Sequence, residues 1–490
     1  MQRLARLVIV LALCFGNVSI TQAATEVKMT GDAIIYGVYF GNKNFTGWNT
    51  SSWNSDLLTY NHAGTQTEDR FQIWERFRLR TDFVASESVK FRLGLKVEDT
   101  WGHGTFTAAN PTVSIAVYQA FLQFKWPGCD VEVTAGLQDL SLPGSALFHD
   151  SVVFADRAAA VLINAPLIED HLRAVFGMAR MMDKNRTYDT TTSQVADEWD
   201  FYFLVMPVTF DGFKATPWAA AASAGLYAQY FTSGSYGTSN FGENLVSAGT
   251  FMAPAGWKYQ QNMYFFTGSA FEVTALDPIK LYADLVYGQG AMADRAKNHR
   301  HGWFIDLGAE YTGWDVLTPQ VFAWWSTGED GSTRNGSERM PIAYSGWGPG
   351  NSFLFDCSQE LVKDSNMGVT PVGNWGLGAS LNNISFLEKL SHRLTFMYVH
   401  GNNSARAIRY LNTAMGSNPY FTMGHDLTVN ETVLGANFDT KYQIYENLAA
   451  ILETGWAHGD FQKSVWGSRL VNQSKTSDVY KVAFGLKYTF

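Results

Sequence analysis

The stretch that decides the fold is VYKVAFGLKYTF, residues 479–490 at the end of the chain. Its residues alternate between two faces without a break. One face is large and apolar or aromatic, with Tyr480, Val482, Phe484, Leu486, Tyr488 and Phe490. The other is small or polar, with Lys481, Ala483, Gly485, Lys487 and Thr489. Period-two alternation with an aromatic-rich face is typical of a transmembrane β-strand between lipid and a polar lumen. An edge strand of a soluble β protein is the alternative, but such edges carry fewer aromatic residues.

Both ends of the chain agree with an outer-membrane barrel. Phe490, with Tyr488 at the third-last position, resembles the signal by which bacterial outer-membrane barrels are recognised for insertion. At the other end, Arg3 and Arg6 precede an apolar run, and Thr21-Gln22-Ala23 offers a small-x-small cleavage site. We therefore expect a signal peptide at residues 1–23 and a mature chain of residues 24–490.

Composition favours a barrel over a soluble enzyme. Charged residues make up 17% of the chain and aromatic residues 15%, yet the mean hydropathy is only −0.11 because apolar and polar residues alternate. The mature sequence has no apolar run of the roughly 18 residues that a membrane-spanning helix needs, so strands are left as the way to cross a bilayer. The formal charge of −9 argues against a nucleic-acid partner.

Short turns and long polar loops alternate along the sequence. The short turns are 85–88, 126–130, 168–170, 210–213, 275–278, 312–315, 387–390 and 442–445. The long loops are near 42–70, 99–112, 139–157, 181–197, 233–261, 291–301, 329–372, 402–427 and 458–478. Eight turns and nine loops predict eighteen antiparallel strands, with sixteen as the alternative. Outer-membrane barrels place short turns in the periplasm and long loops outside, so both termini should be periplasmic.

Charged residues fall on one face of the expected strands, and this face must be the lumen because charges are costly against lipid. With about eighteen strands the interior is too wide for wall side chains to fill, so a wet channel is expected. The first strand, AIIYGVYF at 33–40, begins soon after the expected cleavage site. We therefore predict one barrel domain without a separate plug domain.

Two neighbouring strands carry a basic patch that we call the basic ladder. In ERFRLRTD and VKFRLGLKVED, one face of each strand is apolar, and the other presents Arg76, Arg78, Arg80, Lys90, Arg92 and Lys96. Folding about residues 86–87 is expected to bring Arg80 and Arg92 near each other. Six cations on one wall indicate a pore lining that serves anions. The alternative is a set of solvated charges balanced by Asp82, Glu98 and the following loop.

The loop at 139–157 is too apolar for an extracellular loop in open water. Its Leu-Ser-Leu-Pro-Gly core predicts that the segment folds into the barrel and packs on the wall. Its acidic residues would then face the basic ladder across the constriction, namely Asp139, Asp150 and Asp156. The alternative is a loop that covers the rim or makes subunit contacts.

The stretch from Glu68 to Arg157 resembles a known family. The motifs ERFRLRTDFVASESVKFRLGLKVEDTWG, YQAFLQFKWP and VTAGLQDLSLPG, in this order, are similar to the homotrimeric outer-membrane porins of sulfate-reducing, Desulfovibrio-type bacteria. The resemblance implies a trimeric barrel, surrounded by outer-membrane lipid and lipopolysaccharide, that lets ions and small hydrophilic solutes diffuse passively. It implies no particular solute.

Other functions have less support in the sequence. No phosphate-binding loop, H-E-x-x-H motif, paired C-x-x-C or recognisable nucleophile is present, so we do not expect an enzyme or a cofactor. Asp356, Glu360 and Asp364 are candidate ligands for a structural Ca²⁺ in a loop. The alternative to a general porin is a solute-specific channel for sugars or organic acids, in which Trp324, Trp325 and Trp456 would line the lumen.

Overall fold

The computed structural model describes residues 25–490 with gaps. The gaps are 44, 46–47, 55–58, 67–70, 103–105, 108–109, 112, 184–197, 226–260, 291–298, 333–334, 351–352, 356–359, 362–366 and 410–422, and the side chains of 48–66 and 106–111 are also not described. The expected signal peptide, residues 1–23, lies outside the described residues.

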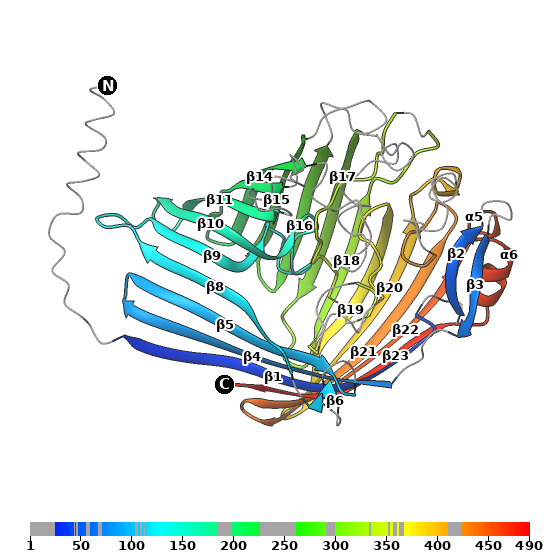
Figure 1. Cartoon of the computed structure of the whole chain (residues 1–490), viewed down its shortest axis with the longest axis horizontal. Helices are drawn as coiled ribbons and strands as arrows, with labels where there is room; N and C mark the ends of the chain where they lie inside the picture. Colours follow the sequence, from blue (N-terminus) through cyan, green and yellow to red (C-terminus); the bar gives the residue numbers. More distant parts are fainter. Residues whose placement is uncertain are drawn as a thin grey trace.

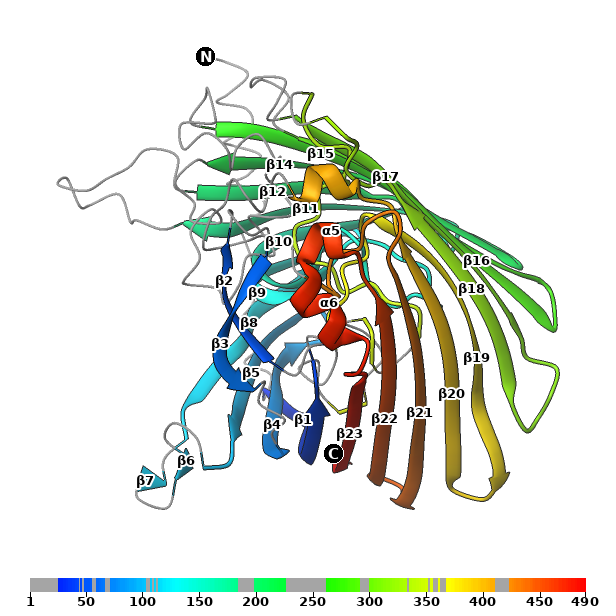
Figure 2. The same cartoon turned by 90° about the vertical axis from the view of Figure 1, so that its right-hand side faces the viewer.

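Eighteen antiparallel strands form one closed sheet (Figures 1 and 2), which confirms the predicted barrel and its strand number. The strands are β1 (Glu26–Gly41), β4 (Phe71–Ser86), β5 (Val89–Thr100), β8 (Ile115–Lys125), β9 (Glu132–Ser141), β10 (Ala155–Ile168), β11 (Leu172–Asp183), β12 (Glu198–Val205) continued by β13 (Val208–Phe210), β14 (Phe213–Gly225), β15 (Gln261–Leu276), β16 (Ile279–Gly290), β17 (Arg300–Tyr311), β18 (Thr318–Ser326), β19 (Asn374–Leu387), β20 (Leu390–Gly401), β21 (Thr432–Tyr445), β22 (Leu448–Asp460) and β23 (Val479–Thr489). β12 and β13 are two pieces of one strand, interrupted at Pro207, which has no N–H to donate.

Smaller elements lie in the long loops. They include the hairpins β2 (Trp48–Asn54) with β3 (Thr59–Gln66) and β6 (Phe106–Thr107) with β7 (Asn110–Pro111), and the helices α5 (Lys463–Trp466) and α6 (Ser468–Ser474). Within the described parts of the chain, no helix is long and apolar enough to cross a membrane.

The connections follow the predicted rhythm with one shift. Seven short turns lie where the sequence predicts them. The eighth was predicted at 442–445, and this is wrong by about three residues, because β21 continues to Tyr445 and the turn is Glu446-Asn447. Neighbouring strands are antiparallel, so all short turns lie at one end of the barrel and all long loops at the other. β1 begins and β23 ends at the turn end.

The barrel closes where β1 pairs with β23, from Asp32 opposite Thr489 to Gly41 opposite Tyr480. Phe490 continues the seam, because its N–H donates to the carbonyl of Gly31 and its carbonyl accepts from the Gly31 N–H. Its ring stacks on those of Phe77 and Tyr488 at centroid distances of 6.1 and 5.7 Å. A Cβ at Gly31 would lie 2.5 Å from the Phe490 ring, so the close approach requires glycine there. Whether Tyr488 and Phe490 also serve as an insertion signal stays a prediction.

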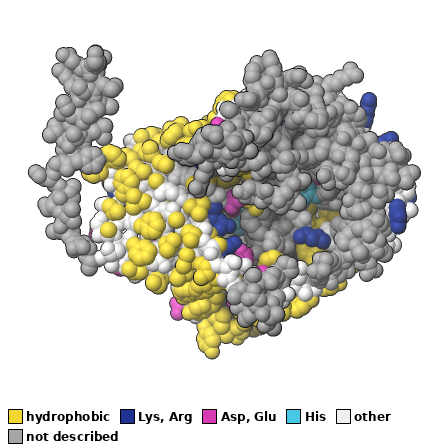
Figure 3. All heavy atoms as spheres, viewed as in Figure 1, with side chains coloured by type: hydrophobic (Ala, Val, Ile, Leu, Met, Phe, Trp, Pro, Cys, Tyr) yellow, Lys and Arg dark blue, Asp and Glu magenta, His cyan; other side chains and the backbone are white. Residues whose placement is uncertain are grey.

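The wall has an apolar outer face. Large apolar side chains point outward and are exposed on strands all around the barrel, among them Ile35, Phe77, Leu285, Leu307, Phe396, Leu434 and Phe484. Figure 3 shows part of this apolar surface, with basic and acidic side chains gathered in the hollow beside it. An apolar band of this extent is what a lipid-facing wall requires.

This two-faced wall predicts opposite outcomes for the same substitution on its two sides. Leu307→Arg places a cation on the outer face of β17, where Leu307 is 57% exposed, and should destabilise the barrel by about 2–4 kcal/mol at mid-depth. Gln320→Arg, on the luminal side of β18, should fold as the unmodified chain does. Urea unfolding in lipid vesicles, followed by tryptophan fluorescence, measures the difference. Equal stability of the two variants would contradict the assignment of the faces.

Candidate functional site: the interior of the barrel

Two loops lie inside the barrel and pair with each other. The first inner loop, residues 142–154, joins β9 to β10, and the second inner loop, residues 337–350, belongs to the connection between β18 and β19. Their backbones are hydrogen-bonded from Ala343 N to Val153 O (2.9 Å), from Ala155 N to Tyr344 O (2.8 Å) and from Gly346 N to Ser151 O (3.1 Å). The two loops therefore form one hydrogen-bonded unit. The sequence analysis expected only the first loop to fold into the barrel.

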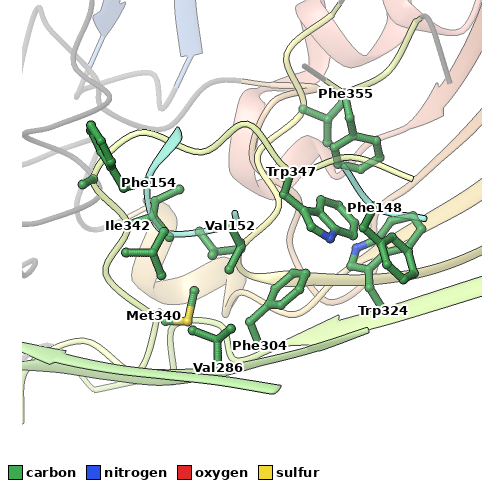
Figure 4. Close-up of a cluster of buried hydrophobic side chains, with 14 of the residues drawn as sticks. Phe148, Val152, Phe154, Val286, Phe304, Trp324, Met340, Ile342, Trp347 and Phe355 are labelled. Atoms are coloured by element: carbon green, nitrogen blue, oxygen red, sulfur yellow. The ribbon is translucent and has the colours of Figure 1, made fainter. Parts of the chain in front are cut away.

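Aromatic side chains join this unit to the inner wall (Figure 4). The Trp347 ring stacks on Phe148 at 5.7 Å and meets Phe304 of β17 and Trp324 of β18 edge-on at 5.0 and 5.4 Å. Each such aromatic pair contributes about 0.5–1.5 kcal/mol beyond the burial of its area. The two loops thus pack an apolar core against the inner face of the wall.

The inner face of the wall beside the loops is apolar as well. Phe201, Ala222, Phe266 and Phe322 belong to the same buried cluster as the two loops. Apolar side chains therefore interrupt the predicted polar inner face where the two loops cover β12, β14, β15 and β18. Polar and charged side chains remain on the inner face of the same strands, among them Asp284, Asp306 and Glu310.

The three acids predicted at the constriction separate in the structure. Asp139 lies in β9, where its carboxylate accepts a hydrogen bond from Gln119 Nε2 at 2.6 Å. Asp156 lies in β10. The carboxylates of Asp139 and Asp156 each have an oxygen 3.9 Å from Arg157 Nε. Asp150 alone belongs to the first inner loop, where it is exposed. Among the described ion pairs, none joins these acids to the basic ladder, although Asp139 is near enough to Arg92 to interact electrostatically with it. The loop itself directs backbone N–H groups to Asp284 of β16 and Glu272 of β15.

The basic ladder occupies the inner face of β4 and β5, and four of its six cations have carboxylate partners. Asp32 of β1 binds Arg78 at 2.7 Å and Arg76 at 3.4 Å. Asp82 accepts two hydrogen bonds from Arg92 at 2.6 and 2.7 Å, and Glu98 pairs with Lys96. Within the described structure, Arg80 and Lys90 have no ion pair. Six cations thus share three carboxylates, which leaves this part of the wall positively charged.

The register explains two details of the ladder: the expected nearness of Arg80 and Arg92, and a partner of Arg78 that the sequence analysis did not name. Arg92 lies directly opposite Asp82, and Arg80 opposes Gly94 one pair further along, so Arg80 and Arg92 are diagonal neighbours. Asp32 is 46 residues before Arg78 in the sequence and becomes its neighbour only because β1 pairs with β4. Its position on the polar face of the first strand was the available signal.

On the other side of the lumen lies a polar void of about 530 Å³ between the first inner loop and β16–β22. Glu310 accepts hydrogen bonds from the Tyr282 hydroxyl (2.6 Å) and from Gln320 Nε2 (2.9 Å). Arg393 binds Asp439 at 2.8 Å. Fixed charges of both signs therefore line this void.

Glu360 ties the connection between β18 and β19 to the wall. Its carboxylate binds Lys487 Nζ at 2.7 Å and Lys441 Nζ at 3.3 Å, and its backbone N–H donates to Glu453. Burial raises the pKa of Glu360, but the two lysines outweigh burial and hold this pKa below its ordinary value.

Of the three residues predicted to bind calcium in the same connection, only Glu360 belongs to the described residues. Asp356 and Asp364 lie outside the described residues, and Glu360 is engaged by two lysines. Among the described residues, no group of three or more His, Cys, Asp or Glu side chains is placed to hold a metal ion.

The three tryptophans considered for an aromatic track do not share the lumen. Trp324 is buried and donates to Asn374 at 2.8 Å. Trp325 is 42% exposed on the outer face, and Trp456 donates to Asp478 from the face opposite Glu453. A solute-specific channel would have to use the polar groups of the lumen instead.

Comparisons with known proteins give a distant likeness to other barrels. No protein-family model matches the chain, and no curated protein matches its sequence. The structure is similar to OccK8 (OprE) of Pseudomonas aeruginosa, with 10% identity, a TM-score of 0.48 and coverage of 95% of this chain and 98% of that one. It is also similar to OccAB3 of Acinetobacter baumannii (9%, 0.48, 94% and 99%) and to a loop L8 deletion mutant of OmpT, an outer membrane protein of Vibrio cholerae (8%, 0.39, 96% and 100%). Likeness at this level assigns neither a family nor a function.

The bridge at Glu360 predicts a response to acid. Because its pKa is lowered in the folded protein, the bridge stabilises the docked segment at neutral pH and is lost as the pH falls through that pKa. Single-channel recordings from neutral pH down to about pH 3 should then show larger or noisier currents in acid. Glu360→Gln should show this behaviour already at neutral pH, whereas Glu26→Gln, at an exposed carboxylate, should behave as the unmodified chain. An identical acid response in Glu360→Gln and the unmodified chain would contradict the prediction.

Proposed function

We propose that this chain is a porin of the bacterial outer membrane, forming a water-filled channel for passive diffusion of ions and small hydrophilic solutes. The observation that carries the proposal is the distribution of charge. The closed barrel is apolar outside, and the charged residues that point inward include the basic ladder on β4 and β5 and the Arg393–Asp439 pair beside the polar void on β20 and β21. A passive channel uses no catalytic group, and we assign none.

The location and orientation follow from the same barrel. Antiparallel barrels of this size belong to outer membranes, where short turns face the periplasm. The start of β1 and the end of β23 both lie at the turn end of the barrel, which supports periplasmic termini. The apolar outer band would contact lipid and lipopolysaccharide.

A solute-specific channel for sugars or organic acids is the second candidate. The observation that favours it is the 530 Å³ void, where Glu310 and Arg393 are held by neighbouring side chains. Fixed polar groups in a space of that size suit one small polar solute.

Planar-bilayer recording and liposome swelling test the proposal. Purified protein should give stepwise ion currents and admit small sugars at rates that rise linearly with solute concentration. Saturation with one solute would favour the specific channel. Absence of both currents and swelling from correctly folded protein would overturn the channel.

The basic ladder should disfavour cations in the channel. Replacing Arg78, Arg80 and Arg92 together with Ser should shift the reversal potential in a KCl gradient towards cation preference. The matched control removes three exposed cations at the loop end, Lys463, Arg469 and Lys475, and should leave the reversal potential almost unchanged. Equal shifts in the two triple variants would show that the ladder has no special influence.

We also propose that three barrels associate. Support comes from the resemblance in sequence and from the outer face of β14, where Pro217, Ala219, Ala221 and Ser223 are all small and permit close packing of walls.

Light scattering in detergent should give the mass of three chains. Ala221→Trp suits lipid but is too bulky for a tight interface, and should release single barrels. Val321→Trp, on the exposed face of β18, should remain a trimer. A single-chain mass for the unmodified protein would refute the trimer.

A further inference from the structure

Two aspartates lie side by side in the wall behind the inner loops. Asp284 of β16 is directly opposite Asp306 of β17, and both are buried. The Asp284 N–H donates to Asp306 Oδ1 at 2.9 Å. Neighbouring buried carboxyl groups are costly unless donors satisfy their oxygens.

The two inner loops supply these donors, one loop to each aspartate. Ser145 of the first loop donates from its backbone N–H to both oxygens of Asp284, at 2.9 and 3.1 Å, and from its hydroxyl at 3.0 Å. Trp347 of the second loop donates from Nε1 to Asp306 Oδ2 at 2.7 Å. Each loop therefore holds a different member of one bonded pair.

The surrounding contacts place the loops around this point. The Ala146 N–H donates to Glu272 of β15 at 3.2 Å, and Leu147 lies against Gly308 of β17, where a Cβ would come within 2.9 Å of it. The loops are also joined through their own backbones, so a displacement of one is transmitted to the other.

We propose that Asp284 and Asp306 are positioning residues that act as one anchor for both inner loops and thereby set the size limit of the channel. The inference rests on the proposed channel function for its second half. The first half, a shared anchor, concerns the position of the loops and can be tested without any current.

Hydrogen exchange of the loop amides, measured by mass spectrometry, tests the shared anchor. Asp284→Ala removes direct bonds only from the first loop, and Asp306→Ala only from the second. With a shared anchor, each variant speeds exchange in both loops, around 145–154 and around 341–348. Faster exchange confined to the directly bonded loop would overturn the proposal.

Conductance and polymer exclusion test the size limit. We expect each single variant to raise conductance by about twofold, since current follows the open cross-section, and the double variant to do no more than the larger single effect. Additive effects indicate independent anchors, and unchanged conductance and polymer cut-off indicate an anchor without influence on the pore. Either result overturns the proposal. If the unmodified protein gives no current while the two variants show the exchange pattern described above, the proposed channel function is refuted and the shared anchor is not.

Two further variants test whether the effects come from loss of the anchor or from general damage to the wall. Ser145→Ala with Trp347→Phe removes the hydroxyl and indole donors but keeps the two bonds from the Ser145 backbone N–H. It should change exchange and conductance in the same direction as the wall variants, by a smaller amount. Thr395→Val disturbs an equally buried polar residue, whose hydroxyl pairs with Ser380 of β19, and should change neither exchange nor conductance. An equal effect of Thr395→Val would mean that the anchor variants act through general loosening of the wall.

Discussion

The wall of this protein is a single layer of β-sheet, and the placement of its charged and apolar side chains depends on that constraint. Successive side chains must point to opposite faces, so an apolar outer face at the level of the hydrocarbon core directs the charges there into the lumen. The register of the strands, and not proximity in the sequence, then determines which charged side chains meet. Asp32 and Arg78 meet because β1 pairs with β4, and Lys481 and Glu453 meet across β22 and β23.

A barrel of eighteen strands encloses more space than its wall side chains fill. The structure answers this with two loops that bring their own aromatic core, centred on Trp347 and Phe148. Glycines on the wall make room for the connection that contains the second loop. At Gly455, for example, a Cβ would lie 2.3 Å from the Phe353 ring. The lumen is thereby divided into a filled, apolar part and a charged part that stays open to water.

The sequence was sufficient for the barrel and the strand number, because both follow from local alternation and from the spacing of turns and loops. The exact strand end at Tyr445 was missed because Ile444 and Tyr445 are consecutive apolar residues that break the alternation, at the point where the pairing with β22 is also irregular. The packing of the second inner loop could not be read, since the pairing of Val153 with Tyr344 joins segments 191 residues apart and has no local signature. Asp284 and Asp306 were visible only as polar positions on two strands, and their loop partners became apparent in three dimensions.

The seam between β1 and β23 also has a consequence for the order of folding. β1 finds β4 early, but its other edge stays unpaired until the last strand of the chain arrives. Contacts between such distant segments are slow to form, and an open strand edge invites pairing with other chains. During biogenesis the incomplete sheet therefore needs protection from aggregation until residues 479–490 have been added. Pairing of this last strand with β1 removes the open edge and completes the barrel.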